Sequence, residues 1–159
     1  METPEEKYGE RLKICEGADV TELEDNIRCA MSILDSFPDI YITIRKHVLE
    51  YGVKNPEYII NGLVADRKGI EHFDGIGLGF KRAMAQGCRA IVIDLDMKMR
   101  NVALKPSKIA QKIENRRKVD FNENAIICCY MVYRGKAVCC TIEMEKQEMA
   151  ALIEQLRPE

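Results

Sequence analysis

The chain has 159 residues, 47% of them hydrophobic and 31% charged, and its 24 basic and 26 acidic residues give a net charge of −2. This length and composition predict one folded domain and exclude an intrinsically disordered chain. The balanced charge also excludes a globally basic nucleic-acid binder, so any contact with a polyanion must be local.

The cysteines and the N-terminus indicate the compartment. Seven cysteines are an odd number, and four of them lie in apolar runs as adjacent pairs, which is typical of core residues in a reducing environment and not of a disulfide framework or a zinc site. The opening residues METPEEKYGERLK lack the apolar segment of a signal peptide, and no apolar stretch is long enough to span a membrane. We therefore expect a cytoplasmic protein with a polar tail over residues 1–18 and a single domain over residues 19–159.

The first elements in chain order are a helix and a strand. Thr21 is expected to cap a helix over residues 21–36, because apolar residues recur there at helical spacing and acidic residues occupy the first turn. Pro38 follows the end of this helix, and the β-branched run over residues 40–44 predicts a strand.

The clearest local pattern is EYII-NG-LVAD, which predicts a β-hairpin. Asn61-Gly62 is the preferred two-residue type I′ turn, and the segments on both sides are strand-like. Glycines at 75, 77 and 79 are expected to loosen the chain before a helix that ends at Gly87.

The rest of the chain predicts a central strand and a series of flanking elements. The apolar run AIVIDL is typical of a buried strand, and Asp94 and Asp96 at its end either lie near the hairpin or simply end the strand. Further elements are expected as a helix over 106–117, strands over 124–133 and 136–143, and a helix over 145–156. The predicted fold is α/β (α+β), with a central mixed β-sheet that includes the NG hairpin and is flanked by helices.

Three hairpin residues form a candidate site for phosphodiester hydrolysis. Glu57 begins one strand, and Asp66 and Lys68 lie late on the other, two residues apart and therefore on one face. Two neighbouring carboxylates can hold Mg²⁺ and leave positions for water and a phosphate oxygen. The lysine can orient the attacking water or neutralise charge that develops on the phosphate.

The pattern Pro56-Glu57, eight residues, Asp66-Arg67-Lys68 resembles the signature of the PD-(D/E)XK nucleases, with Glu57 where the family usually has Asp. The longer stretch NPEYIINGLVADRKG, followed by Ala85-Gln86-Gly87 and the strand AIVIDL, resembles nuclease toxin domains at the C-termini of contact-dependent growth-inhibition proteins and of some phage head proteins. The resemblance spans residues 20–96.

This resemblance implies a restriction-endonuclease-like core and a nuclease that cuts RNA, tRNA among its substrates, or DNA with Mg²⁺ or Mn²⁺. It implies that Glu57 and Asp66 bind the metal, that Lys68 assists the water, and that Glu24 is an additional acidic residue of the site. It places Gln86 on a helix facing the site, and it implies an immunity protein or other partner. Because Glu57 is one methylene longer than the usual ligand, the geometry of the metal site is in question.

Other interpretations stay open at this point. A non-catalytic binding or regulatory module of a mobile element could retain the same fold, and in it Glu57 and Asp66 would not converge. His72 could act as the general base of a metal-independent RNase, or be merely exposed. A basic helix face could contact a nucleic-acid backbone or simply be solvated; its residues are Lys105, Lys108, Lys112, Arg116 and Arg117.

Overall fold

A seven-stranded mixed sheet forms the centre of the protein, for which a computed structural model describes residues 1–158. The strands are β1 (Leu12–Ile14), β2 (Ile42–Ile44), β3 (Tyr58–Ile60), β4 (Leu63–Gly69), β5 (Ala90–Asp94), β6 (Cys128–Tyr133) and β7 (Lys136–Thr141). They lie side by side in the order of the chain, with β1/β2, β4/β5 and β5/β6 parallel and the other neighbours antiparallel. The predicted α+β fold class is confirmed.

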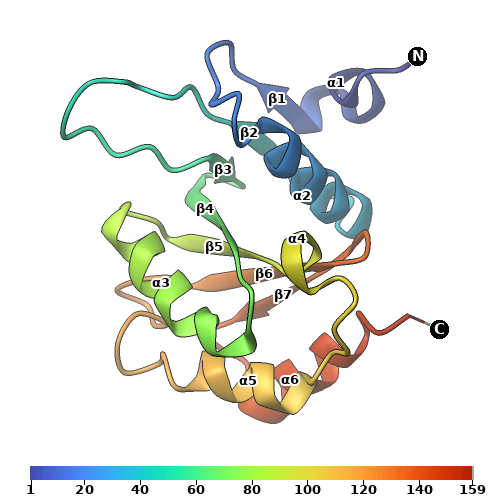
Figure 1. The fold of residues 1–159 in the computed structure, drawn as a ribbon, viewed down its shortest axis with the longest axis vertical. Coiled ribbons are helices and arrows are strands. Elements are labelled where there is room, and N and C mark those ends of the chain that lie inside the picture. The colour runs from blue at the N-terminus through green and yellow to red at the C-terminus, as the bar shows by residue number, and fades with distance from the viewer. Residues whose placement is uncertain (159) are drawn as a thin grey trace.

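Helices cover both faces of this sheet (Figure 1). They are α1 (Pro4–Tyr8), α2 (Leu23–Ser36), α3 (Ile76–Ala85), α4 (Asp96–Met99), α5 (Pro106–Glu114) and α6 (Lys146–Glu154), with short 3-10 turns η1 (Gly9–Arg11) and η2 (Phe73–Gly75). Apolar residues of α3, α5 and α6 pack on one face, and those of α2 pack on the other, so the sheet separates two hydrophobic clusters. No helix within residues 1–158 is both long enough and apolar enough to cross a membrane.

The NG hairpin and the central strand agree with the sequence predictions. Asn61 has φ 46° and Gly62 has φ 82°, as a type I′ turn requires at both central positions. All five residues of β5 are buried, because helices cover both of its faces. These two elements position the candidate site.

Two helix starts differ from the prediction. The helix α2 begins at Leu23, and the Thr21 hydroxyl donates to Asp19 Oδ1 at 2.7 Å instead of capping the helix. The helix α3 already begins at Ile76, so the glycines at 77 and 79 lie inside it. A Cβ at Gly79 would lie 3.4 Å from Lys68 Cβ, which explains why a glycine is useful there: it lets α3 pack closely on β4.

The N-terminal segment differs most from the prediction. Residues 1–18, expected as a polar tail, contain α1, η1 and the edge strand β1, which pairs with β2. Leu12 is buried in the cluster beneath α2. The charged neighbours of this three-residue strand hide its pattern in the sequence, and its partner lies about thirty residues away.

The cysteines occur as the sequence predicted. All seven are free, and Cys129 and Cys140 are fully buried at opposed positions of β6 and β7. They act as small core residues of the sheet.

Candidate active site

The hairpin places Glu57 opposite Asp66. Tyr58 pairs with Ala65, so the next pair toward the open end of the hairpin is Glu57 with Asp66, and opposed residues of antiparallel strands share a face. The Glu57 N–H donates to Asp66 Oδ1 at 3.2 Å, and the Arg67 N–H donates to Glu57 Oε2 at 2.6 Å. The two carboxyl groups therefore converge.

This proximity changes the protonation of the pair. Burial, the hydrogen bond with Asp66 and the negative charge of Asp66 raise the pKa of Glu57 to about 9. Two carboxyl groups in contact do not both ionise readily, and the Asp66 carboxylate therefore favours the protonated form of Glu57.

Lys68 completes the group predicted from the hairpin. Its Nζ lies 2.8 Å from Asp66 Oδ2, and its side chain is only partly exposed while that of Asp66 is buried. The two residues are two positions apart on β4, so their side chains leave the same face of the strand. The Lys68 side chain also lies against Gly79 of α3, which limits where its ammonium group can reach.

Arg45 and Gln86 contribute three of the hydrogen bonds that fix the loop leading into Glu57. The Arg45 guanidinium donates to the Pro56 carbonyl at 2.9 Å, and the Arg45 N–H donates to the Glu57 carbonyl at 2.8 Å. Gln86, at the end of α3, accepts from the Asn55 N–H at 3.1 Å. Gln86 therefore supports the segment before Glu57, although the carboxylates themselves are bound by other groups.

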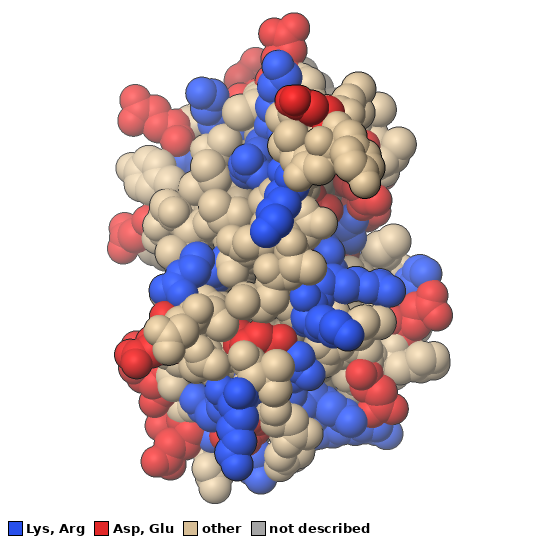
Figure 2. Space-filling view, turned by 90° about the vertical axis from the view of Figure 1, so that its left-hand side faces the viewer, with Lys and Arg blue, Asp and Glu red and all other residues tan. Residues whose placement is uncertain are grey.

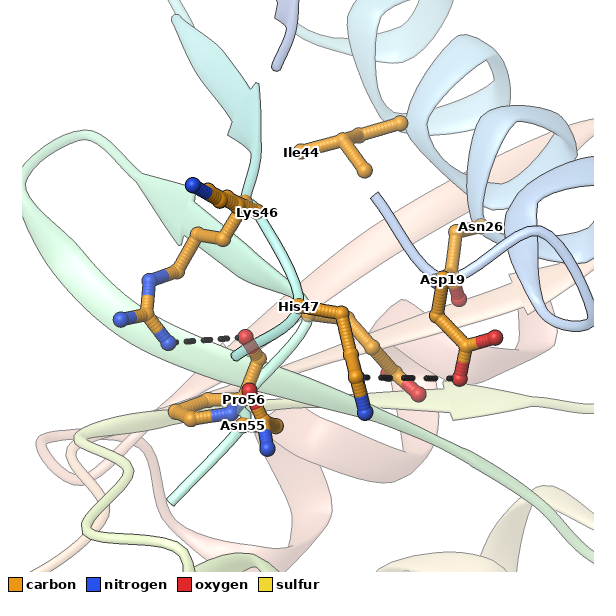
Figure 3. Close-up of a pocket in the computed structure, with 9 residues that line it drawn as sticks. Asp19, Asn26, Ile44, Lys46, His47, Asn55 and Pro56 are labelled. Atoms are coloured by element: carbon orange, nitrogen blue, oxygen red, sulfur yellow. Dashed lines mark hydrogen bonds and ion pairs between the residues drawn. The ribbon is translucent and has the colours of Figure 1, made fainter. Parts of the chain in front are cut away.

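A small pocket of about 50 Å³ lies between this loop and the start of α2 (Figure 3). In Figure 3, Asp19 and His47 point toward one another, and their Oδ2 and Nδ1 atoms are 3.8 Å apart. Asn26 of α2 and Glu57 also line the pocket. At this volume it has room for a few water molecules and not for a nucleotide.

A different set of charges occupies the opposite face of the sheet. Asp94 is fully buried, and its Oδ2 lies 2.6 Å from Arg28 Nη2 and 3.2 Å from Arg67 Nη1. Arg67 also donates to Asn26 Oδ1 at 2.8 Å and forms an ion pair with Glu22. These residues link α2, β4 and β5, and each charge has an opposite charge beside it.

Sequence reasoning missed most of this network. It left Asp94 either near the hairpin carboxylates or at a strand end, whereas Asp94 lies across the sheet from them and binds arginines. The sequence does contain one indication of this network. Asp94 and Arg67 are charged residues within predicted strands, and a charged residue that is buried in a strand needs a partner of opposite charge. The identity of the partners depends on how α2 packs, which the sequence does not show.

The structure places Glu24 away from the hairpin pair. Glu24 is exposed on α2 and lines a separate pocket with Arg28 and Asp35, among others. The residues that reach toward β4 from this region are instead Glu22, just before α2, and Asn26 within it.

The basic residues predicted to contact nucleic acid have several different surroundings. Lys112 Nζ lies 2.7 Å from Asp74 Oδ1, and Lys108 Nζ lies 4.0 Å from the same atom. Arg116 pairs with Asp120 at 2.6 Å. Lys105 is exposed at the start of α5, whereas Arg117 packs over the Phe121 ring and donates to the Ile142 carbonyl at 2.8 Å. Arg116 and Arg117 thus hold the local structure together.

The remaining candidates concern metal and histidine chemistry. His72 is exposed just before η2. Among residues 1–158, no group of three or more His, Cys, Asp or Glu residues is arranged to hold a metal ion. Mg²⁺, however, is usually bound through one or two carboxylates with water and substrate phosphates as the other ligands, and Glu57 and Asp66 fit that donor set.

Comparisons with known proteins support the fold. No known protein family and no curated protein matches the sequence. A chain of the CdiA-CT/CdiI toxin and immunity complex from Burkholderia pseudomallei has a similar structure, with a TM-score of 0.55 and 15% sequence identity over 81% of this chain and 98% of that chain. The fold is therefore similar to that of a protein from a toxin and immunity complex, in line with the resemblance seen in the sequence.

Proposed function

We propose that this protein is a metal-dependent nuclease that hydrolyses phosphodiester bonds in RNA or DNA. The observation that carries the proposal is the convergence of Glu57 and Asp66 at the hairpin, with Lys68 held 2.8 Å from Asp66. A non-catalytic module has no need of two largely buried carboxyl groups in contact, an arrangement that is costly to fold. The convergence therefore favours the enzyme over the binding module.

Each of the three side chains has a proposed role. Glu57 and Asp66 would hold Mg²⁺ or Mn²⁺, which when bound activates water and polarises a phosphate oxygen. Lys68 is positioned by Asp66 and would neutralise negative charge that develops on the phosphate. Gln86 and Arg45 act through the backbone of residues 55–57 and keep Glu57 opposite Asp66.

We further propose that an immunity-type protein binds this chain and blocks its activity. The support is the similar fold in a complex that contains both a toxin and an immunity protein. That likeness alone does not assign either role, but the hairpin carboxylates favour the toxin role for this chain.

The test is a cleavage assay with tRNA, single-stranded DNA and double-stranded DNA in Mg²⁺ or Mn²⁺. Asp66→Asn and Lys68→Met should each lower the cleavage rate by about 100-fold or more, and a chelator should abolish cleavage. Asp39→Asn is the matched control, because it removes an exposed carboxylate in the loop before β2. All variants are purified identically, so that a contaminating nuclease would cut equally in every sample.

Two results would overturn the proposal. One is the absence of both metal binding and cleavage of any of these substrates by the wild-type protein. The other is cleavage that persists unchanged in Asp66→Asn or in chelator.

A further inference from the structure

A second, larger pocket adjoins Lys68 on the side away from Asp19 and His47. It has a volume of about 370 Å³ and lies between the end of β4, the start of α3 and α4. Pockets that bind small ligands in proteins begin at about 300 Å³, so one nucleotide unit is a suitable occupant. The 50 Å³ pocket beside Glu57 is much too small for that.

The lining of this larger pocket is strongly basic. Three cationic side chains from three different elements line it, Lys68 from β4, Arg82 from α3 and Lys98 from α4. The one carboxylate in the lining is Glu71, which pairs with Lys98 at 2.5 Å. Figure 2, which faces the α3 side of the molecule, shows lysine and arginine side chains at several places on this face, with aspartate and glutamate side chains among them.

Arg82 has a distinct position in this group. It is exposed, and the ion pairs within residues 1–158 do not include it. Lys98 pairs with Glu71 in the pocket lining, and Lys68 pairs with Asp66 of the candidate active site. A guanidinium with no internal partner retains all its donors for an anionic ligand, and its planar fork matches phosphate oxygens.

The remaining walls suit the other parts of a nucleotide. Gly75 and Gly79 contribute no side chains to the lining, and the side chains of Ile70 and Lys68 lie against them. Leu78 is 48% exposed and, with Ile70, gives the pocket an apolar side for a sugar or a base. The pocket thus combines a basic wall with an apolar one.

We propose that this pocket, which we call the phosphate pocket, binds the nucleotide next to the scissile bond of a nucleic-acid strand, with its phosphate on Arg82 and Lys98. This inference rests on the proposed nuclease function, because Lys68 lies at once in the candidate active site and in the pocket wall. A strand with one phosphate at Lys68 would place a neighbouring phosphate in the pocket. The phosphate pocket therefore selects a polynucleotide over a simple phosphate ester.

The test measures binding without cleavage. A fluorescent single-stranded 12-nucleotide RNA is titrated with protein in chelator, and the affinity is measured at several salt concentrations. Arg82→Gln combined with Lys98→Gln should weaken binding about tenfold or more at moderate salt. The slope of log affinity against log salt should fall by about 0.7 for each phosphate contact that is lost.

The matched control removes the same amount of charge from elsewhere. Lys81→Gln combined with Lys118→Gln changes two exposed basic residues that do not line the pocket, one of them adjacent to Arg82. This control should weaken binding by less than about threefold. All four positions are at the surface or rim, and circular dichroism checks that both variants fold.

The outcomes separate this inference from the proposed function. Equal weakening by both double variants, no weakening by the pocket variant, or no RNA binding by the wild type would overturn the phosphate pocket. If the predicted binding pattern holds but Mg²⁺ and Mn²⁺ produce no cleavage of any substrate, the pocket stands and the nuclease proposal fails. If cleavage depends on Asp66 but the pocket variant binds like the wild type, the nuclease proposal stands and the phosphate pocket fails.

Discussion

The buried ionisable side chains on the two faces of β4 have different partners. On the α2 face, Arg67 and Asp94 form a network with Arg28 in which each charge contacts an opposite one. On the α3 face, Asp66 shares its surroundings with a second carboxyl group, Glu57, and has only Lys68 as a cationic partner. Adjacent residues of one strand thus belong to a balanced network and to an unbalanced one.

The difference indicates which charges serve the fold and which serve a function. A buried ion-pair network connects elements and gains little from a ligand. Two carboxyl groups buried against one another cost stability, and such an arrangement persists where a site needs it. The balanced face is the structural one, and the hairpin pair is the candidate site.

The largest expected effect comes from breaking the balanced network. Asp94→Ala would remove the buried carboxylate that Arg28 and Arg67 share and leave Arg67 with Glu22 as its acidic partner, so the free energy of unfolding should fall by about 3–5 kcal/mol in urea denaturation. Asp74→Ala is the control, because Asp74 pairs with Lys112 at the surface and should cost less than about 1 kcal/mol. Similar losses in the two variants would contradict the structural role of the network.

Metal that binds to Glu57 and Asp66 on the α3 face should stabilise the protein. At a Mg²⁺ or Mn²⁺ concentration 100 times the dissociation constant, the wild type should gain about 2.7 kcal/mol, measured as a rise in melting temperature. Asp66→Asn should show no such rise, since it removes one of the two proposed ligands. Asp39→Asn should respond like the wild type, and a rise in Asp66→Asn equal to that in the wild type would place the metal elsewhere.

The two faces should also respond to pH with opposite signs. The pKa of Glu57 is raised to about 9, so the folded state holds this proton more tightly than the unfolded chain. Its contribution to stability is complete below the ordinary glutamate pKa of 4.5 and is lost as pH rises toward 9. For Asp94, burial alone would raise the pKa, but the hydrogen bond and charge of Arg28 and the charge of Arg67 hold it below its ordinary value. That contribution is present above pH 3.8 and is lost as pH falls below it.

Glu57→Gln separates these two effects. In chelator, unfolding of the wild type at pH values from about 5 to about 9 should show a decline in stability that is shallower in the variant. The difference in slope is at most about 1.4 kcal/mol per pH unit, because one proton is involved. The decline in stability at acid pH, to which Asp94 contributes, should not change. Identical slopes in the two proteins would mean that Glu57 does not hold a proton.

The hairpin could be predicted from the sequence, whereas the residues that support it could not. The hairpin was predictable because its cause is local: Asn61 and Gly62 tolerate positive φ, and the two-residue period of strands then sets Glu57 opposite Asp66. The residues of α2 that contact β4 were not predictable, because their identity depends on packing between distant segments. Whether Glu24 or Asn26 turns toward β4 follows from the rotation of α2 on the sheet.

The N-terminal strand and the start of α3 show the same limit. Pairing of β1 with β2 joins segments that are far apart in sequence, and local patterns do not reveal it. Glycines at 77 and 79 resemble a loop in the sequence, yet the helix includes them because Lys68 and Arg116 lie against their faces. These glycines are helical because α3 packs closely against its neighbours, although glycine has a low intrinsic helix propensity.

The smallest expected effect comes from removing the Gln86 side chain, which supports the loop before Glu57. Gln86→Ala removes the acceptor of the Asn55 N–H, so the free energy of unfolding should fall by about 1 kcal/mol. Gln147→Ala, an exposed change on α6, should stay within about 0.5 kcal/mol of the wild type.

The informative result for Gln86 is the metal affinity. If Gln86 positions Glu57 through residues 55–57, the affinity for Mn²⁺ in isothermal titration calorimetry should fall in Gln86→Ala by up to about tenfold, as for other residues that orient a ligand. A loss of stability with unchanged affinity would make Gln86 a residue of the fold alone. In that case the loop before Glu57 would be held by the Arg45 hydrogen bonds, and the site would depend on the β2 side of the hairpin instead of α3.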